Sequence, residues 1–195
     1  MYSEHLLIFA ALSNTNFKPK SILEIGTFDG KTALILSDLF PESIVNTIDL
    51  KDNDVLFKNT YHRNKKNKFS EKRNKIINSN SKINFIQSNS LNLTLNNKLQ
   101  NQDLIWVDGA HGYPIVTSDI TNSIRLLNDS GILMCDDVWK SLRRNDAFYN
   151  SVGSYQTLNA FENAGILKTT YFRKRISLKY SSNYKYVSFS ILNKN

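Results

Sequence analysis

The chain has 195 residues, of which 41% are hydrophobic and 11% aromatic, and its formal net charge is +8. This length and composition allow a substantial buried core and exclude an intrinsically disordered chain. No apolar run approaches the roughly 18 to 20 residues that a membrane span needs, and the single cysteine, Cys135, cannot form an internal disulfide. We therefore expect one soluble, cytoplasmic domain spanning residues 1–195.

The first half of the chain alternates apolar runs with helical patterns. Its opening apolar segment follows Glu4 and His5 rather than a basic segment, so it predicts a helix packed on the domain and not a secretion signal. A short apolar run closing on Gly26 predicts a strand, and a run rich in β-branched residues ending at Asp49 predicts another. The predicted elements are a helix at 6–12, a strand at 21–26, a helix at 31–40 and a strand at 43–49.

The second half continues the alternation and ends differently. It predicts strands at 83–87, 104–107 and 132–135, helices at 114–127 and 155–164, and two extended segments at 169–178 and 184–192. The last two segments are close enough in sequence to form an antiparallel pair. Five strands alternating with helices predict an α/β fold, a mostly parallel sheet with helices on both faces and this strand pair at the C-terminus.

The positive charge is concentrated in one segment. Between Lys58 and Lys75 eight basic residues face one acidic residue, Glu71, a local excess of seven. Such a run is typical of a solvated connector or lid, here at about 51–80, and it also suits a surface that attracts an anionic substrate or a nucleic acid. The sequence leaves both interpretations open.

A glycine loop follows the first predicted strand. Gly26 and Gly30 allow a tight turn and a close approach of the backbone to a ligand, and Asp49 ends the next strand about 20 residues further on, where a carboxylate can accept both ribose hydroxyls. These features predict a nucleoside pocket at the carboxyl ends of the strands. The spacing Glu-x-Gly-x-x-x-Gly differs from the G-x-G-x-x-G of dinucleotide folds.

This loop resembles the first motif of class I S-adenosylmethionine-dependent methyltransferases. The resemblance extends from Ile22 through the terminal strand pair and implies a Rossmann-like sheet of seven strands with the last strand antiparallel. It implies that the loop holds the methionine part of S-adenosylmethionine, that Asp49 holds the ribose, and that the segment after the third strand holds the adenine edge; an ordinary polar turn is the alternative for that segment. The cofactor-binding residues so predicted are Glu24, Gly26, Thr27, Phe28, Gly30, Asp49, Ser88, Asn89, Ser90 and Asp108.

An acidic trio follows two adjacent predicted strands. Asp108 ends the fourth strand and Asp136 and Asp137 end the fifth, so their carboxylates should meet and repel unless a hard divalent cation such as Mg²⁺ neutralises them. With His111, they resemble the metal-dependent O-methyltransferases, particularly bacterial enzymes acting on sugars of natural products; relatives acting on catechols have a lysine where this chain has His111. The resemblance implies a metal held by Asp108, Asp136 and Asp137, with His111 as general base. Ala110 departs from the acidic residue that many relatives have there.

These observations predict an S-adenosylmethionine-dependent O-methyltransferase for a small hydroxylated acceptor, such as a sugar or a saccharide-containing metabolite, assisted by a divalent metal. Two alternatives remain. One is a nucleic-acid-binding protein or RNA methyltransferase using the basic segment, although the Asn-Pro-Pro-Tyr motif of amino-methylating enzymes is missing after the fourth strand. The other is a nucleoside-binding fold relative without catalysis. An anionic acceptor and a homo-oligomer are compatible with the sequence, and no membrane partner is expected.

Overall fold

The computed structural model describes residues 3–59, 66–95, 99, 101–142, 151–174 and 184–193. The first half of the chain contains α1 (Ser3–Ser13), β1 (Ser21–Ile25), α2 (Lys31–Leu39), β2 (Ile44–Asp49), α3 (Val55–Asn59), α4 (Lys66–Ile77), β3 (Ile83–Gln87) and the 3₁₀ helix η1 (Ser90–Leu95). The second half contains β4 (Gln102–Val107), α5 (Ile115–Leu126), β5 (Leu127–Trp139), α6 (Gly153–Asn163), β6 (Leu167–Arg173) and β7 (Lys185–Leu192). None of the helices among these residues has the length and apolar character of a membrane span.

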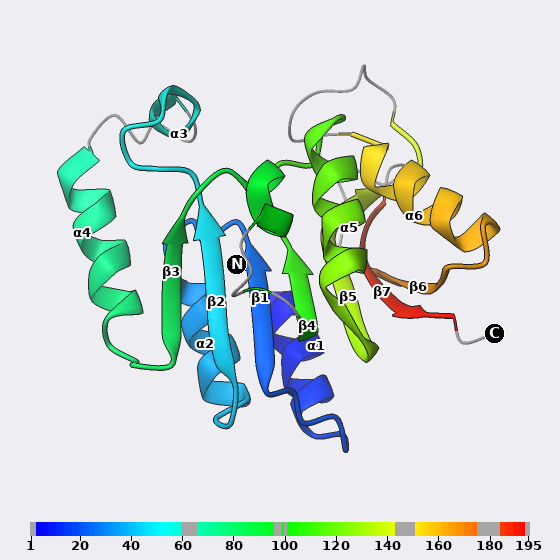
Figure 1. Ribbon diagram of the computed structural model, residues 1–195, viewed down its shortest axis with the longest axis horizontal. Helices are drawn as coiled ribbons and strands as arrows, with labels where there is room; N and C mark the ends of the chain where they lie inside the picture. Colours follow the sequence, from blue (N-terminus) through cyan, green and yellow to red (C-terminus); the bar gives the residue numbers. More distant parts are fainter. Residues whose placement is uncertain are drawn as a thin grey trace.

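The seven strands form one sheet in the order β3-β2-β1-β4-β5-β7-β6 (Figure 1). Strands β1 to β5 pair in parallel, whereas β7 is antiparallel to both of its neighbours. The predicted α/β fold, with seven strands and a C-terminal antiparallel pair, is confirmed. The strand order reverses between β1 and β4, and Ile25 lies in register with both Ile48 and Val107, so the carboxyl ends of β1, β2 and β4 meet at one edge. Ligands of open α/β sheets bind at such an edge.

Helices cover both faces of this sheet (Figure 1). One core joins the sheet to α1, α2 and α4, and the other joins it to α5, α6 and η1. The central strands β1 and β4 are buried on both faces, as their nearly continuous apolar sequences require. Trp106 of β4 is fully buried and packs edge-on against Phe9 and His5 of α1, each with ring centroids 5.1 Å away. These contacts fix α1 beneath the carboxyl end of β4.

Strand β5 is longer than the predicted strand at 132–135. It continues through Asp136 and Asp137 because β7 pairs with it on both sides of a β-bulge, which lies between Cys135 and Val138. Asp137 takes a left-handed conformation with φ of 47°. A bulge redirects side chains and is common next to active sites. The aspartate pair therefore belongs to a distorted strand and not to a loop that follows one.

The basic segment contributes a structural cation. Arg73 of α4 is fully buried, and its two terminal nitrogens donate to the Asp52 carboxylate at 2.8 and 2.9 Å. Its guanidinium lies 4.4 Å from the ring centroid of Phe85. Phe69 of the same helix packs between the rings of Phe28 and Phe57, with centroids 5.4 and 6.2 Å away. Part of this segment is thus core structure, and Arg73 cannot belong to a nucleic-acid surface; residues 60–65 lie outside the described part of the chain.

Candidate active site

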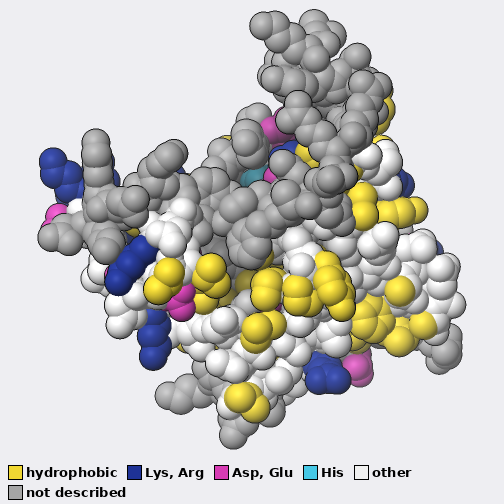
Figure 2. Space-filling view, turned by 90° about the horizontal axis from the view of Figure 1, so that it is seen from above, with side chains coloured by type: hydrophobic (Ala, Val, Ile, Leu, Met, Phe, Trp, Pro, Cys, Tyr) yellow, Lys and Arg dark blue, Asp and Glu magenta, His cyan; other side chains and the backbone are white. Residues whose placement is uncertain are grey.

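The polar groups predicted to form a site gather at the carboxyl edge of the sheet. Figure 2 looks down on this edge and shows a histidine side chain with acidic and basic neighbours, near hydrophobic side chains. The site has two halves: the glycine loop after β1 with Asp49 of β2, and a cluster of charged side chains at the ends of β4 and β5.

The glycine loop lies directly against the end of β4. Gly26 has φ of 104°, and a Cβ atom built on it would lie 2.3 Å from the carbonyl oxygen of Asp108. No other residue can therefore replace glycine without moving the loop. Gly30 is also left-handed, with φ of 79°, and the Phe28 amide donates to the Asp49 carboxylate at 3.1 Å. The structure thus brings together the predicted loop, Asp49 and Asp108.

Glu24 and two threonines line the base of this loop. Glu24 is 1% exposed and accepts a hydrogen bond from Thr47 on one carboxylate oxygen, while the hydroxyls of Thr27 and Thr47 lie 2.7 Å apart. The other oxygen of Glu24 is buried without a hydrogen-bond partner among the described residues. Burial raises the pKa of Glu24 to about 8, against the hydrogen bond from Thr47 and with help from the nearby negative charge of Asp49. A buried polar oxygen without a partner is unusual, and it marks the base of this loop as a candidate ligand site.

The raised pKa of Glu24 makes a stability prediction. The pKa of Glu24 is about 8 in the folded state and 4.5 ordinarily. The contribution of Glu24 to the free energy of unfolding is therefore fully present below pH 4.5 and is lost as the pH rises through 8. The loss should be on the order of several kcal/mol. Urea unfolding between pH 5 and 9 should show this decline in the wild type and a flatter profile in Glu24→Gln. Glu42→Gln, at an exposed glutamate, should behave as the wild type. Equal slopes for Glu24→Gln and the wild type would contradict the prediction.

The segment after β3 has mixed roles. The Ser88 amide donates to the Asp49 carbonyl at 2.9 Å, which places it beside the predicted ribose position. Asn89 accepts a hydrogen bond from the Leu91 amide at 3.0 Å and is thus a polar turn residue directly before η1. Ser90 faces Asp119 of α5, a 1% exposed carboxyl whose pKa burial raises to about 6, opposed by the Ser90 hydroxyl. Adenine binding by this segment stays a prediction, and no pattern in the sequence singles out Asp119.

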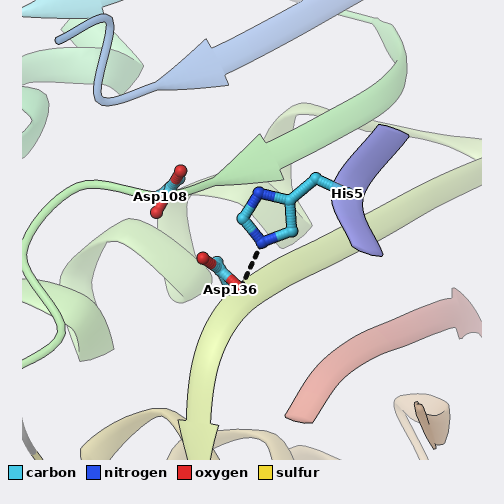
Figure 3. A group of neighbouring side chains, drawn as sticks. All are labelled: His5, Asp108 and Asp136. Atoms are coloured by element: carbon cyan, nitrogen blue, oxygen red, sulfur yellow. Dashed lines mark ion pairs between the residues drawn. The ribbon is translucent and has the colours of Figure 1, made fainter. Parts of the chain in front are cut away.

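The second half of the site contains a histidine that the sequence analysis did not assign. Figure 3 shows His5 of α1 beside Asp108 and Asp136. The Nε2 atom of His5 lies 2.9 Å from Asp136 Oδ1. One ligand atom from each of these three residues lies within 4.8 Å of the others. His5 is 2% exposed. The local sequence does not predict that His5 lies beside these aspartates, because its position depends on how α1 packs against β4 and β5.

Two lysine side chains form ion pairs with Asp136 and Asp137. Lys174 Nζ lies 2.7 Å from Asp136 Oδ1 and 2.8 Å from Asp137 Oδ1, and Lys185 Nζ donates to the other oxygen of Asp137. Lys174 is 6% exposed, so its ammonium group is held almost entirely away from water. These lysines follow β6 and begin β7, and they were also missed by the sequence analysis.

His111 lies on the turn between β4 and α5, and it is 6% exposed. Its Nε2 atom is 3.8 Å from Asp108 Oδ1, too far for a hydrogen bond, and its Nδ1 atom has no hydrogen-bond partner among the described residues. Burial lowers the pKa of His111, although the carboxylates of Asp137 and Asp136 oppose this effect. Burial, with repulsion from the same two carboxylates, raises the pKa of Asp108 well above its usual value. A neutral His111 can accept a proton.

The carboxylates do not fit the predicted magnesium ion. Both oxygens of Asp137 and one oxygen of Asp136 are already engaged by ammonium groups. A metal on Asp108, Asp136 and Asp137 would have to displace buried Lys174 and Lys185. The alternative group with His5 shares the same Asp136 oxygen with Lys174. A metal ion could bind these carboxylates only in place of the lysine contacts.

Comparisons with known proteins define the class. A family model described as a methyltransferase domain matches residues 23–138. Among solved structures, TomG, an O-methyltransferase of Streptomyces achromogenes in complex with SAM, matches with 14% identity and a TM-score of 0.69, covering 100% of this chain and 82% of that one. An O-methyltransferase of Bacillus cereus in complex with SAH matches with 16% identity and a TM-score of 0.67, covering 98% and 82%. A search of curated proteins gives no significant match.

The fold is thus the one found in these O-methyltransferases, which were solved with SAM or SAH bound. The family match covers more than half of the sequence. The chain belongs to the methyltransferase-domain family.

Proposed function

We propose that this protein transfers a methyl group from S-adenosylmethionine to a hydroxyl group of a small acceptor. One observation carries the proposal: Asp108 joins the two halves of the site. Its carbonyl oxygen lies against Gly26 in the cofactor loop, and its carboxyl group lies 3.8 Å from the buried His111. A cofactor cradle and a candidate base therefore share one strand end.

The loop and its neighbours support cofactor binding. Gly26 lets the loop lie against the Asp108 backbone where a Cβ atom would clash, Asp49 offers a carboxylate at the end of β2, and Glu24 has a buried oxygen without a hydrogen-bond partner among the described residues. When bound, S-adenosylmethionine supplies an electrophilic methyl group. The protein's contribution is then to orient the acceptor hydroxyl and remove its proton.

His111 is the group we assign to proton removal. Its lowered pKa keeps the imidazole neutral at physiological pH, which a general base requires. The buried surroundings exclude water and strengthen electrostatic interactions with the acceptor. The identification of the acceptor as a sugar or a saccharide-containing metabolite rests on the sequence resemblance and stays part of the proposal. The divalent metal of the sequence-based prediction is left out of it, because Lys174 and Lys185 hold the carboxylates that would bind the ion.

The test is a screen of hydroxylated acceptors, sugars included, for methyl transfer from S-adenosylmethionine. Formation of a methyl ether supports the proposal. Methylation confined to amines or RNA, or cofactor binding without turnover on any hydroxylated acceptor, would contradict it and favour the alternatives.

Cofactor binding gives a prediction that needs no acceptor. S-adenosylhomocysteine should raise the melting temperature of the wild type, because a ligand that binds only the native state stabilises it by mass action. Asp49→Ala should lose most of this shift, since it removes the ribose acceptor and the partner of the Phe28 amide. Asp38→Ala, at an exposed position on α2, is the matched control and should keep the shift. Scanning calorimetry measures all three; a full shift in Asp49→Ala would refute the assignment.

A further inference from the structure

We propose that Lys174, supported by Lys185, takes the place of a divalent cation in this site, so that the protein works without a metal ion. The inference deepens the proposed function and rests on it for the chemistry. The ammonium group of Lys174 is the internal counterion of the Asp136 and Asp137 carboxylates.

The contacts of Lys174 are those of a cation built into the site. Its Nζ atom bridges one oxygen of each aspartate, at 2.7 and 2.8 Å. Such charge-assisted hydrogen bonds are strong when both partners are buried, and the Lys174 and Asp136 side chains are 6% and 4% exposed. Breaking the pair would leave buried charge without compensation. A divalent ion would have to pay that cost before it could bind.

The fold enforces this placement. The β5 bulge puts Asp136 and Asp137 side by side opposite β7, and Asp137 adopts its left-handed conformation there. The Lys174 amide donates to the Lys185 carbonyl at 2.8 Å, so the two lysines face each other across the end of the β6–β7 pair. Lys185 is in register with Trp139, just beyond the bulge, and its ammonium lies 5.2 Å from the Trp139 ring centroid. Backbone pairing thus delivers both ammonium groups to the aspartates.

The charges of Asp136 and Asp137 are balanced without a metal. Two ammonium groups face the two carboxylates of Asp136 and Asp137, and His5 completes the shell of Asp136 from α1. An added divalent cation would be repelled by both lysines at short range, where screening by water is weak. Lys174 is accordingly a positioning residue: it holds the carboxylate pair in place beside Asp108 and His111.

The experiment measures Mn²⁺ binding by electron paramagnetic resonance in the wild type, Lys174→Met and Lys168→Met, without an acceptor. Methionine keeps much of the length of lysine without its charge, and Lys168 is an exposed residue of β6 at the far end of the strand. We expect no saturable binding to the wild type or Lys168→Met up to about 1 mM, and at least about tenfold tighter binding to Lys174→Met, because a nearby positive charge is gone.

Tight Mn²⁺ binding to the wild type would overturn the inference, and this measurement stands even if Lys174→Met fails to fold. Equally weak binding to a folded Lys174→Met, with an unchanged response to S-adenosylhomocysteine, would overturn it too. Once an acceptor is known, wild-type turnover should be unchanged by excess chelator, and loss of turnover on chelation would contradict the inference. Failure of the proposed function would appear separately, as no methyl transfer to any hydroxyl, and would leave the Mn²⁺ result readable.

Discussion

Replacing His111 by glutamine should lower the rate of methyl transfer by about 10²- to 10⁴-fold, the usual effect of losing a general base. Glutamine retains hydrogen-bonding capacity and similar bulk but cannot take up the acceptor proton. The affinity for S-adenosylhomocysteine should hardly change, because the cofactor loop does not depend on the imidazole. Steady-state kinetics with calorimetry separates the two effects. Tyr113→Phe, on the same turn and 77% exposed, is the control and should retain wild-type turnover.

The pH dependence of the same reaction provides a second readout. Because the pKa of His111 is lowered from 6.5 by burial, the neutral, active form should persist at neutral pH, and kcat should fall only below about pH 6.5 as the imidazole is protonated. His111→Gln should lack this acidic limb and regain some rate at high pH, where hydroxide can remove the proton. Wild-type turnover in His111→Gln would remove the assignment of His111 as base.

The placement of the glycine loop beside Asp49 could be predicted because its signals are local. Gly26 and Gly30 adopt backbone conformations that favour glycine, and Asp49 ends the adjacent strand, so spacing alone places them together. The same reasoning brought Asp108, Asp136 and Asp137 to one edge of the sheet. The hydrophobic patterns of parallel strands and covering helices are distinct, so they predicted the order of most helices and strands along the chain.

The charged half could not be predicted in full, because its partners come from distant parts of the chain. Three neighbouring carboxylates repel one another unless a cation neutralises them. The sequence-based prediction assigned this role to a bound metal, whereas in the structure the ammonium groups of Lys174 and Lys185 lie against Asp136 and Asp137. Their sequence positions, in the terminal strand pair, carry no sign that they reach β5 across the β7 register. The position of His5 likewise depends on the packing of α1 against Trp106. Long-range contacts of this kind have no local pattern.

The basic segment shows the same limit in a single residue. The sequence pattern placed Arg73 among eight basic residues predicted to form a solvated segment, yet its side chain is fully buried on α4. Its guanidinium forms a bidentate pair with Asp52 and lies over Phe85. Because Asp52 follows β2 three residues after Asp49, this pair ties α4 to the wall of the cofactor site.

Asp52→Ala should destabilise the protein by about 2 to 3 kcal/mol, far more than an ordinary surface substitution. The reason is an asymmetry: the Asp52 side chain is 37% exposed, whereas Arg73 is fully buried. Removing Asp52 leaves a buried guanidinium whose remaining hydrogen-bond partner among the described residues is the Asn74 side chain. Uncompensated buried charges typically cost about 3–5 kcal/mol, reduced here by the partial exposure of the carboxylate. Asp38→Ala on α2 is the control, with an expected change within about 0.5 kcal/mol.

A second substitution should reverse much of this loss. Arg73→Met removes the stranded charge while keeping an apolar chain against Phe85, so the double variant Asp52→Ala/Arg73→Met should be more stable than Asp52→Ala alone.

The Arg73 guanidinium also holds the pKa of Asp52 below its usual 3.8, so the pair stabilises the fold above that value and its contribution is lost as the pH falls through the lowered pKa. The difference between the wild type and Asp52→Ala should therefore shrink in strongly acidic solution. Urea unfolding of the wild type, Asp52→Ala and the double variant at pH 7 and at a series of pH values below 3.8 measures both effects. A double variant less stable than Asp52→Ala would show that Arg73 stabilises the fold by packing and not as the partner of Asp52.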